Sequence, residues 1–363
     1  MKSIEEAKES DYDFYRPIKE KYAPGKLIVS IIIDVYYGLD LLAQAVQSVL
    51  DQDYVNVELI LINNGADVDI TAYMQDVYNK NSNTSLIHFK KNQFTWDDNQ
   101  KYMAVCWNSG LLNCKGDIIG HLSYDDLLSE NCCSSMAKLF TENDNCVTAG
   151  PLPVSIDING DINKSMTNLL KDENKRDRYI DGKELAIDFI TGSHNKFFGA
   201  PGGILFTKKD LLIQCGGYDR SWDSTQIIKL AIYGDCGFDP TAKLYWRHHS
   251  GQLNKMGKAR GVTWCHVLQK TVNSELIIDS WVKMFSSDDV RLLKRYIAIT
   301  PRNESVDIAM GYIRGKDFKS YFSNLYNLYH KCPSNLFYVI TYSPIEVIKM
   351  IKQKIKEFYR AYE

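Results

Sequence analysis

The sequence lacks the long hydrophobic run that a membrane-spanning helix requires. Its longest apolar stretch, Leu27–Tyr37, is shorter than the roughly 20 residues that cross a bilayer. Charge of one sign is also missing, because 43 Lys and Arg residues stand against 45 Asp and Glu residues. No overall basic field therefore indicates nucleic acid as a partner. The first residues are polar and acidic, so we expect no secretory signal peptide and a cytoplasmic location.

The spacing of the nine cysteines does not indicate a disulfide or metal-binding framework. Their number is odd and no pair has the CxxC spacing. Free thiols in a reducing compartment are the simplest interpretation, and the pattern argues against metal or disulfide clusters of cysteine.

Several catalytic and nucleotide-binding motifs are absent as well. The sequence has no GxxxxGK[ST], no GxGxxG after its first strand, no HExxH and no GxSxG. These absences exclude P-loop nucleotide hydrolysis, Rossmann-type dinucleotide binding, zincin chemistry and a nucleophile elbow. The loop Asp34–Gly38 carries no basic residue, which argues against a sugar nucleotidyltransferase.

The first 150 residues alternate between buried strands and amphipathic helices. Apolar, β-branched runs predict strands, and apolar positions at helical spacing predict helices. The expected strands are Leu27–Tyr36, Val57–Ile62, Ser85–Phe89 and Asp117–Leu122, and the expected helices are Leu39–Leu50, Ile70–Asn79 and Asn99–Asn113. This order predicts an α/β fold with an open, mostly parallel sheet and helices on both of its faces.

The rest of the chain is less regular. We expect residues 151–196 to be polar and irregular, and a short strand within Gly199–Thr207. Helices at Lys208–Cys215 and Asp223–Tyr233 and a strand at Lys243–Trp246 should follow. After about residue 262 the pattern becomes helical.

Polar residues end three of the expected strands. These ends are Asp34, Asn63-Asn64-Gly65 and Ser123-Tyr124-Asp125-Asp126. In open α/β sheets, ligands bind outside the carboxyl ends of the strands, so we expect the ligand site at this edge. Ordinary turns remain the alternative for each end taken alone.

Six segments together resemble the family 2 glycosyltransferases of the GT-A fold. They are Val29–Gly38, Ser48–Tyr54 with Val57–Gly65, Asn108–Asp117, His121–Leu128, Gly216–Asp219 with Trp222-Asp223, and Arg247–Gln252. Each segment is weak alone, but all six occur in the order of the family. The resemblance covers about residues 27–253. It implies an N-terminal extension over 1–26 and a lid loop with a C-terminal helical region over 254–363.

The resemblance implies an inverting enzyme of the hexosyltransferase type. It would move a sugar from a nucleotide diphosphate-sugar, with a UDP-sugar favoured, to a hydroxyl of a glycan or lipid-linked acceptor in surface polysaccharide synthesis. Four departures from the family pattern keep a second hypothesis open. Ser123 replaces the first acid of Asp-x-Asp, Asn63 and Asn64 replace an acidic pair, Trp222 replaces Glu, and Trp107 replaces Arg. A non-catalytic GT-A-like module that binds nucleotide sugar or glycan is therefore the alternative.

A divalent cation, Mn²⁺ or Mg²⁺, fits the expected chemistry, because the leaving diphosphate carries charge that must be neutralised. By the resemblance, Asp125 is a metal ligand and Asp126 orients the site. His249 can add a nitrogen ligand, which Mn²⁺ accepts. The alternatives are a helix cap for Asp125-Asp126 and a surface pair for His248 and His249.

Donor-binding residues are expected along the same edge. They are Val35, Tyr36, Asn63, Asn64, Ser123 and Tyr124, with Lys255 and Lys258 from a mobile lid. The amide of Asn63 can pair with uracil, because it both accepts and donates. A solvated basic loop is an equal interpretation of the segment that holds Lys255, Lys258 and Arg260.

Asp223 is the expected catalytic base. The acceptor hydroxyl loses a proton as it attacks, and a positioned carboxylate can take that proton. The alternative is that Asp223 caps the helix that follows it.

The last segment, Ile345–Tyr362, has an apolar stripe flanked by lysines. Such a helix can lie on an anionic membrane, which fits a lipid-linked acceptor. The alternative is packing on the preceding helices or on a second subunit, so a homodimer stays open.

Overall fold

A computed structural model describes residues 3–17, 21–95, 101–163, 177–191, 205–219, 227–252, 256, 274–314, 317–331 and 333–344. The chain forms two compact units. One consists of Met1–His249 with Glu275–Phe285, and the other of Ser250–Ser274 with Ser286–Glu363. We describe each unit by itself.

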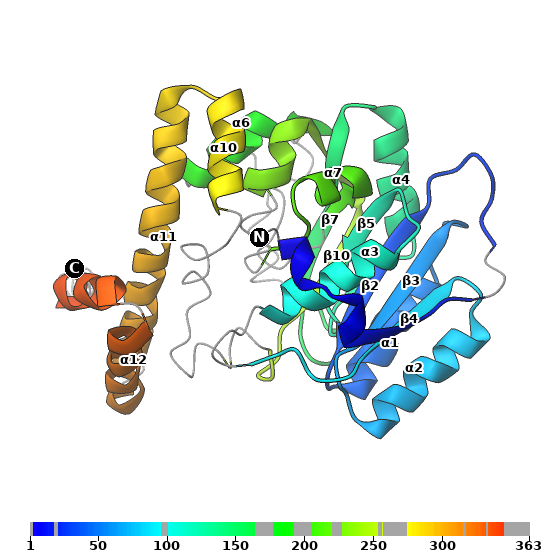
Figure 1. Ribbon diagram of the computed structural model, residues 1–363, viewed down its shortest axis with the longest axis horizontal. Coiled ribbons are helices and arrows are strands. Elements are labelled where there is room, and N and C mark those ends of the chain that lie inside the picture. The colour runs from blue at the N-terminus through cyan, green and yellow to red at the C-terminus, as the bar shows by residue number, and fades with distance from the viewer. Residues whose placement is uncertain are drawn as a thin grey trace, which may run out of the picture. The chain divides into compact units, whose positions relative to one another are not determined.

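The first unit is built on a 10-stranded sheet (Figure 1). The strand order is β1-β4-β3-β2-β5-β9-β7-β10-β6, and β8 pairs with β10. The strands are β1 (Tyr12–Tyr15), β2 (Val29–Val35), β3 (Val57–Asn63), β4 (Thr84–Phe89), β5 (Ile118–His121), β6 (Leu127–Leu128), β7 (Cys146–Ile156), β8 (Tyr179–Asp181), β9 (Phe206–Lys208) and β10 (Asp235–Arg247).

Helices cover both faces of this sheet (Figure 1). The helices and helical turns described in this unit are α1 (Leu39–Leu50), α2 (Val68–Lys80), a π-helical turn at Met103–Trp107, α3 (Asn108–Asn113), α4 (Cys132–Glu142), α6 (Gly182–Thr191), α7 (Lys209–Gln214), a 3-10 turn at Ala231–Tyr233 and α10 (Ser274–Met284). Short 3-10 turns at Ser3–Glu6 and Glu9–Asp11 precede β1.

Successive residues of the central strands pack into two different cores. Ile31 and Ile33 of β2 lie in the core that α1, α2 and α4 share. Ile32 lies in the opposite core, with the π-helical turn and α3. This alternation follows from the period of two in a strand, and it explains why β2 is apolar at nearly every position. The predicted mostly parallel sheet with helices on both faces is confirmed.

Three neighbouring parallel strands place their carboxyl ends at one edge. β2 pairs in parallel with β3, from Val29↔Val57 to Val35↔Asn63, and also with β5, up to Ile32↔His121. The polar residues that end β2, β3 and β5 therefore meet at the same edge of the sheet.

The expectation of an irregular segment at 151–196 is wrong. β7 continues to Ile156 and is buried at every position, and β8 and α6 follow within this range. Pro151 and Pro153 suggested a loop, because proline cannot donate a ladder hydrogen bond. The strand tolerates them next to an irregularity, since the register with β10 shifts between Asp239 and Lys243.

Two further differences concern Tyr12–Tyr15 and Asn99–Asn113. Tyr12–Tyr15 forms a strand antiparallel to β4, so residues of the expected N-terminal extension join the sheet. The expected single helix Asn99–Asn113 contains the π-helical turn Met103–Trp107. Such turns widen a helix locally and are frequent at functional sites.

The second unit is helical, as predicted. It contains α11 (Ser287–Arg314), α12 (Phe318–Lys331) and a helical stretch at 333–344. Its small core is formed by Val306, Ala309, Met310, Leu328 and Val339. Within the described residues, no helix is long and apolar enough to cross a membrane.

Candidate functional site

The loop Ser123–Asp126 follows β5 and is fixed to the end of β10 by Arg247. The backbone N–H of Arg247 donates to Oδ1 of Asp126 at 2.8 Å, and its Nε donates to the backbone oxygen of Asp125 at 2.8 Å. Both aspartates are buried. The strand Leu127–Leu128 follows them, so the alternative of a helix cap at Asp125-Asp126 is wrong.

The guanidinium of Arg247 is itself fully buried and bound on several sides. It donates to the backbone oxygen of Ile158 at 2.8 Å and to the side-chain oxygen of Gln44 on α1 at 2.9 Å. A buried cation is tolerated only when its N–H groups have acceptors. Arg247 thus holds the Asp125-Asp126 loop, β10 and α1 in one arrangement. The sequence motif contained Arg247, but its spacing alone did not reveal this role.

Asp125 and His249 converge, as expected. His249 Nε2 lies 2.9 Å from Oδ2 of Asp125, although 124 positions separate the two residues. Their side chains are only 10% and 11% exposed, which rules out a lone surface histidine at 249. A carboxylate oxygen beside an imidazole nitrogen is a donor pair that Mn²⁺ accepts. The described residues contain no group of three or more His, Cys, Asp or Glu side chains that could hold a metal.

A second polar cluster lies at the ends of β2 and β5. Oδ1 of Asp34 accepts from Trp107 Nε1 at 2.7 Å and is 2.8 Å from His121 Nε2. The rings of Trp107 and His121 stack with their centroids 3.5 Å apart. The sequence drew attention to Asp34 as a strand end and to Trp107 as a departure from the family. Only the register of β2 with β5 could have connected them to His121.

Asn63 and Asn64 hold the turn after β3. Asn63 donates through Nδ2 to Thr71 Oγ1 and accepts from the backbone N–H of Ala66, both at 2.8 Å. Oδ1 of Asn64 accepts from the backbone N–H of Gln93 at 2.8 Å. These bonds engage the same groups that were expected to bind a base. Each amide oxygen keeps a second lone pair, and each NH₂ group a second N–H.

Tyrosines surround this edge of the sheet. Tyr36 and Tyr37 are exposed, and the rings of Tyr37 and Tyr124 are 5.3 Å apart. Burial raises the pKa of Tyr124, and the neighbouring Asp125 carboxylate raises it further. Burial likewise raises the pKa of Tyr102 well above its ordinary value, with Asp34 contributing. Both phenols therefore remain protonated hydrogen-bond donors at neutral pH.

Val35 is buried, and its backbone oxygen accepts from the N–H of Asn64 at 2.9 Å.

The Gly216–Asp219 motif is tied to the Asn108 motif. Asn108 accepts from the backbone N–H of Tyr218 at 2.7 Å and donates to the Tyr218 oxygen at 3.0 Å. Asp219 forms a buried ion pair with Lys229, with a 2.9 Å N–O distance. The segment that leads towards Asp223 is thus anchored. Asp223 itself lies outside the described residues, as do Trp222, Lys255, Lys258, Arg260 and the tail 345–362.

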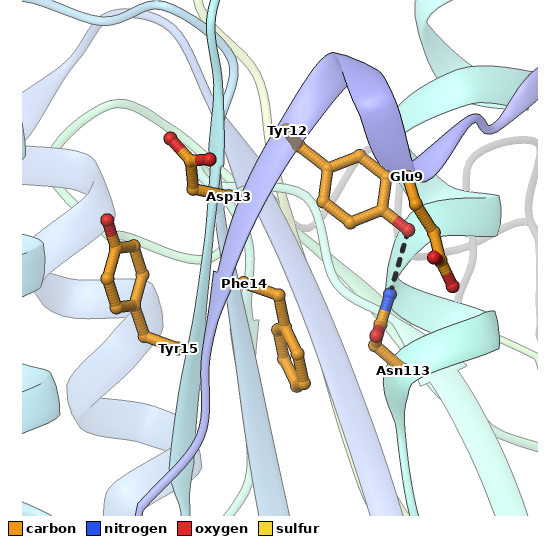
Figure 2. Close-up of a pocket in the computed structure, with 6 residues that line it drawn as sticks. All are labelled: Glu9, Tyr12, Asp13, Phe14, Tyr15 and Asn113. Carbon is orange, nitrogen blue, oxygen red and sulfur yellow. Dashed lines mark hydrogen bonds between the residues drawn. The ribbon is translucent and has the colours of Figure 1, made fainter.

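A separate hollow of about 510 Å³ lies along the edge strand β1. Figure 2 shows its lining residues; Nδ2 of Asn113 donates a hydrogen bond to the hydroxyl of Tyr12 at 3.0 Å. Glu9, Asp13, Phe14 and Tyr15 complete the lining. None of the expected site residues lines this hollow, so it is distinct from the candidate site.

Known proteins share part of this sequence and this fold. Residues 30–199 match the family model described as Glycosyl transferase family 2. An uncharacterized glycosyltransferase of Rickettsia typhi (strain ATCC VR-144 / Wilmington) is 30% identical over 124 residues, which make up 34% of each chain. The chain spans less than half the length of the first three curated relatives that it matches.

Solved structures confirm the GT-A fold. S. aureus TarS 1-349 in complex with UDP-GlcNAc has a TM-score of 0.53 at 12% identity, over 84% of this chain and 92% of that one. The mannosyltransferase PcManGT from Pyrobaculum calidifontis, in complex with GDP-Man and Mn²⁺, has a TM-score of 0.50 at 10% identity, over 90% of each chain. At these identities the likeness concerns the fold alone.

Proposed function

We propose that this protein is an inverting glycosyltransferase. It transfers a sugar from a nucleotide diphosphate-sugar, with a UDP-sugar favoured, to a hydroxyl of a glycan or lipid-linked acceptor in surface polysaccharide synthesis. The observation that carries the proposal is the meeting of Asp125 and His249 at the carboxyl edge of a GT-A sheet. Two solved neighbours that hold nucleotide sugars support it.

Asp125 and His249 are the residues that would hold Mn²⁺ or Mg²⁺. Their oxygen and nitrogen fit such a cation, which neutralises the charge of the leaving diphosphate. Two protein ligands leave positions for diphosphate oxygens and water, an arrangement that Mg²⁺ commonly adopts. Asp126 acts through Arg247, because its carboxylate fixes the backbone of β10 two residues before His249.

The nucleotide binds along the ends of β3, β2 and β5. We assign the base to Asn63 and Asn64, through the second lone pair and second N–H of their amides. Val35 and Tyr36 border this place, and Tyr36 offers an exposed ring on which a base can stack. Ser123 and Tyr124 lie on the diphosphate side, next to Asp125. Lys255 and Lys258 supply cations from the following loop.

Asp223 is the general base in this proposal. It follows a segment that Asn108 and Lys229 anchor. Its carboxylate takes the proton of the acceptor hydroxyl as that hydroxyl attacks the sugar, a contribution of about 10²–10⁴-fold. A lipid-linked acceptor would approach from a membrane surface, where the tail 345–362 would bind.

A non-catalytic binding module is the second candidate. It is favoured by Asn63 and Asn64, whose amides already serve the turn after β3. Ser123 and Trp222 favour it further, because neither supplies the carboxylate usual in the family.

A thermal-shift panel of nucleotide sugars, each with and without Mn²⁺, tests both candidates. The enzyme should be stabilised by one donor in the presence of Mn²⁺ and should then hydrolyse that donor slowly. Metal-dependent binding without any hydrolysis or transfer would favour the binding module. No stabilisation by any nucleotide sugar would contradict the enzyme, and it would reduce the second candidate to a module that binds glycan.

A further inference from the structure

The carboxylate of Asp34 is held through one of its two oxygens. Trp107 Nε1 and His121 Nε2 both approach Oδ1, at 2.7 and 2.8 Å. In the described part of the chain, no hydrogen bond reaches Oδ2. The side chain is 12% exposed, so it is largely desolvated without being closed off. A carboxylate has about four acceptor positions, and this one retains unused acceptor capacity in a mostly dry setting.

The two donors are themselves rigid. His121 ends β5, and its ring stacks on that of Trp107 with an interplanar angle of 28°. Trp107 ends the π-helical turn and meets the ring of Tyr218 edge-on at 5.5 Å. Packing on both sides of the indole fixes the direction of its N–H. Asp34 is therefore oriented before any ligand arrives.

Asp34 lies level with Ser123 across two neighbouring strands. Ile32 of β2 pairs with His121 of β5, and the N–H of Leu122, directly after β5, donates to the Ile32 oxygen at 2.9 Å. Two residues further on, each strand reaches its polar end. Asp34 thus supplies a carboxylate where Ser123 offers only a hydroxyl.

The order of the strands matches the order of the groups in a nucleotide. Along the edge, β3 ends in Asn63, β2 leads to Asp34, and β5 leads to Asp125. Neighbouring strands are about 4.8 Å apart, so the distance from one strand end to the next is roughly the size of one part of the nucleotide: base, ribose or diphosphate. With the base at Asn63 and the diphosphate at Asp125, the ribose falls at Asp34.

We propose that Asp34 binds the ribose of the donor nucleotide by accepting hydrogen bonds from its hydroxyls. His121 and Trp107 are positioning residues that turn the carboxylate towards the ribose. This inference rests on the proposed function, because it requires a nucleotide at this edge. A ribose has hydroxyl donors, which suit a carboxylate that retains unused acceptor capacity.

Nucleotides that lack one hydroxyl give a direct test. Binding of UDP, 2′-deoxy-UDP and 3′-deoxy-UDP with Mn²⁺ is measured by calorimetry, with the corresponding GDP series in parallel. The full-length protein should prefer the complete ribose to at least one deoxy analogue by about tenfold or more, the effect of a hydrogen bond to a charged group. Asp34→Asn should reduce that preference to about twofold or less, because an amide that satisfies Trp107 and His121 turns its NH₂ towards the ribose.

A matched control comes from the opposite end of the same strands. Asp117 Oδ2 accepts from the backbone N–H of Ile28 at 2.8 Å, before β2 and β5 begin. Asp117→Asn should leave the ribose preference unchanged even if it lowers stability. Trp107→Phe, which keeps the ring but not the N–H, should give an intermediate preference.

The outcomes separate the two proposals. A protein that binds UDP or GDP but shows no ribose preference overturns the role of Asp34. An Asp34→Asn protein that weakens all three nucleotides of a series equally shows that Asp34 only supports the fold. A protein that binds neither series overturns the proposed function itself.

Discussion

The guanidinium of Arg247 donates a hydrogen bond to the side-chain oxygen of Gln44 at 2.9 Å, although 203 positions separate the two residues. Gln44 lies on α1, directly after the first strand end, and Arg247 ends β10. This bond links α1, which follows the first motif, to the last motif, and Arg247 also holds Asp125 and Asp126. The geometry of the Asp125–His249 pair therefore depends on a residue that need not touch a ligand.

Arg247→Met should lower the free energy of unfolding by about 3 kcal/mol, because it leaves several buried acceptors without donors. Urea denaturation measures this effect. Gln44→Ala is the control. It removes one hydrogen-bond acceptor of Arg247 from an exposed position of α1, and it should lower the free energy of unfolding by about 1 kcal/mol or less. Equal stabilities of wild type and Arg247→Met would contradict the role assigned to the guanidinium.

Asp125→Asn should weaken Mn²⁺-dependent nucleotide binding by at least about tenfold, because the amide is a poorer ligand for a hard cation. Titration calorimetry with and without EDTA measures the metal-dependent part. Asp144→Asn, an exposed position in the turn before β7, should bind like the wild type. Suppose that Asp125→Asn binds the nucleotide with full affinity in the presence of Mn²⁺, and that EDTA abolishes binding equally in all three proteins. Another residue would then hold the metal.

Asp223→Asn should leave donor and metal binding nearly intact. Turnover should fall by at least about 100-fold, the lower range for the loss of a general base. A steady-state transfer assay, together with nucleotide binding, measures both quantities. If the variant were only less stable, by the roughly 1 kcal/mol of a lost helix cap, and transferred sugar at the wild-type rate, Asp223 would be a cap and nothing more.

Gly38→Ala should destabilise the loop between β2 and α1. Gly38 has φ of +90°, and a Cβ at this position would lie 2.7 Å from Cε2 of Tyr124. The left-handed backbone alone costs about 1–2 kcal/mol for a residue other than glycine. Thermal or urea unfolding measures the loss. The double variant Gly38→Ala with Tyr124→Ala should show a coupling energy above about 0.5 kcal/mol, and strict additivity would exclude the contact.

The chain of 363 residues should co-sediment with liposomes that contain anionic lipid, and a chain that ends at residue 344 should not. The physical reason is the attraction of about 1 kcal/mol per lysine to an anionic surface, which the tail 345–362 would provide. Neutral liposomes are the control and should pellet neither protein. Equal pelleting of both chains would assign the tail to packing within the protein or between subunits.

The central sheet was predictable because its signal is local. β2 and β3 are continuous apolar runs, and α1 has the same limits in the sequence pattern and in the structure. β7 was missed because Pro151 and Pro153 carry the local signal of a loop, whereas pairing with β10 on one side and β9 on the other decides the outcome. Tertiary context overrides propensity in strands more readily than in helices.

The candidate site was predictable only in part. Asp125 and His249 each belong to a recognisable motif, so their convergence could be expected. The bond from His121 to Asp34 depends on the register of β2 with β5, which no single segment specifies. The engagement of Asn63 by Thr71 depends likewise on how α2 begins. Residue types therefore indicated where the site lies, and long-range pairing determined which oxygens and nitrogens remain available.

The position of β10 in the sheet has a consequence for how the protein is made. β10 lies between β7 and β6, and it brings Arg247 to the Asp125-Asp126 loop more than a hundred residues after that loop has been synthesised. A nascent chain that has emerged only as far as residue 230 already contains the whole matched segment 30–199. It can pair β2, β3, β4 and β5, because those contacts lie within the emerged part. In that chain Asp125 cannot yet meet His249, so the part of the edge that holds Asn63 and Asp34 can form before the Asp125–His249 pair.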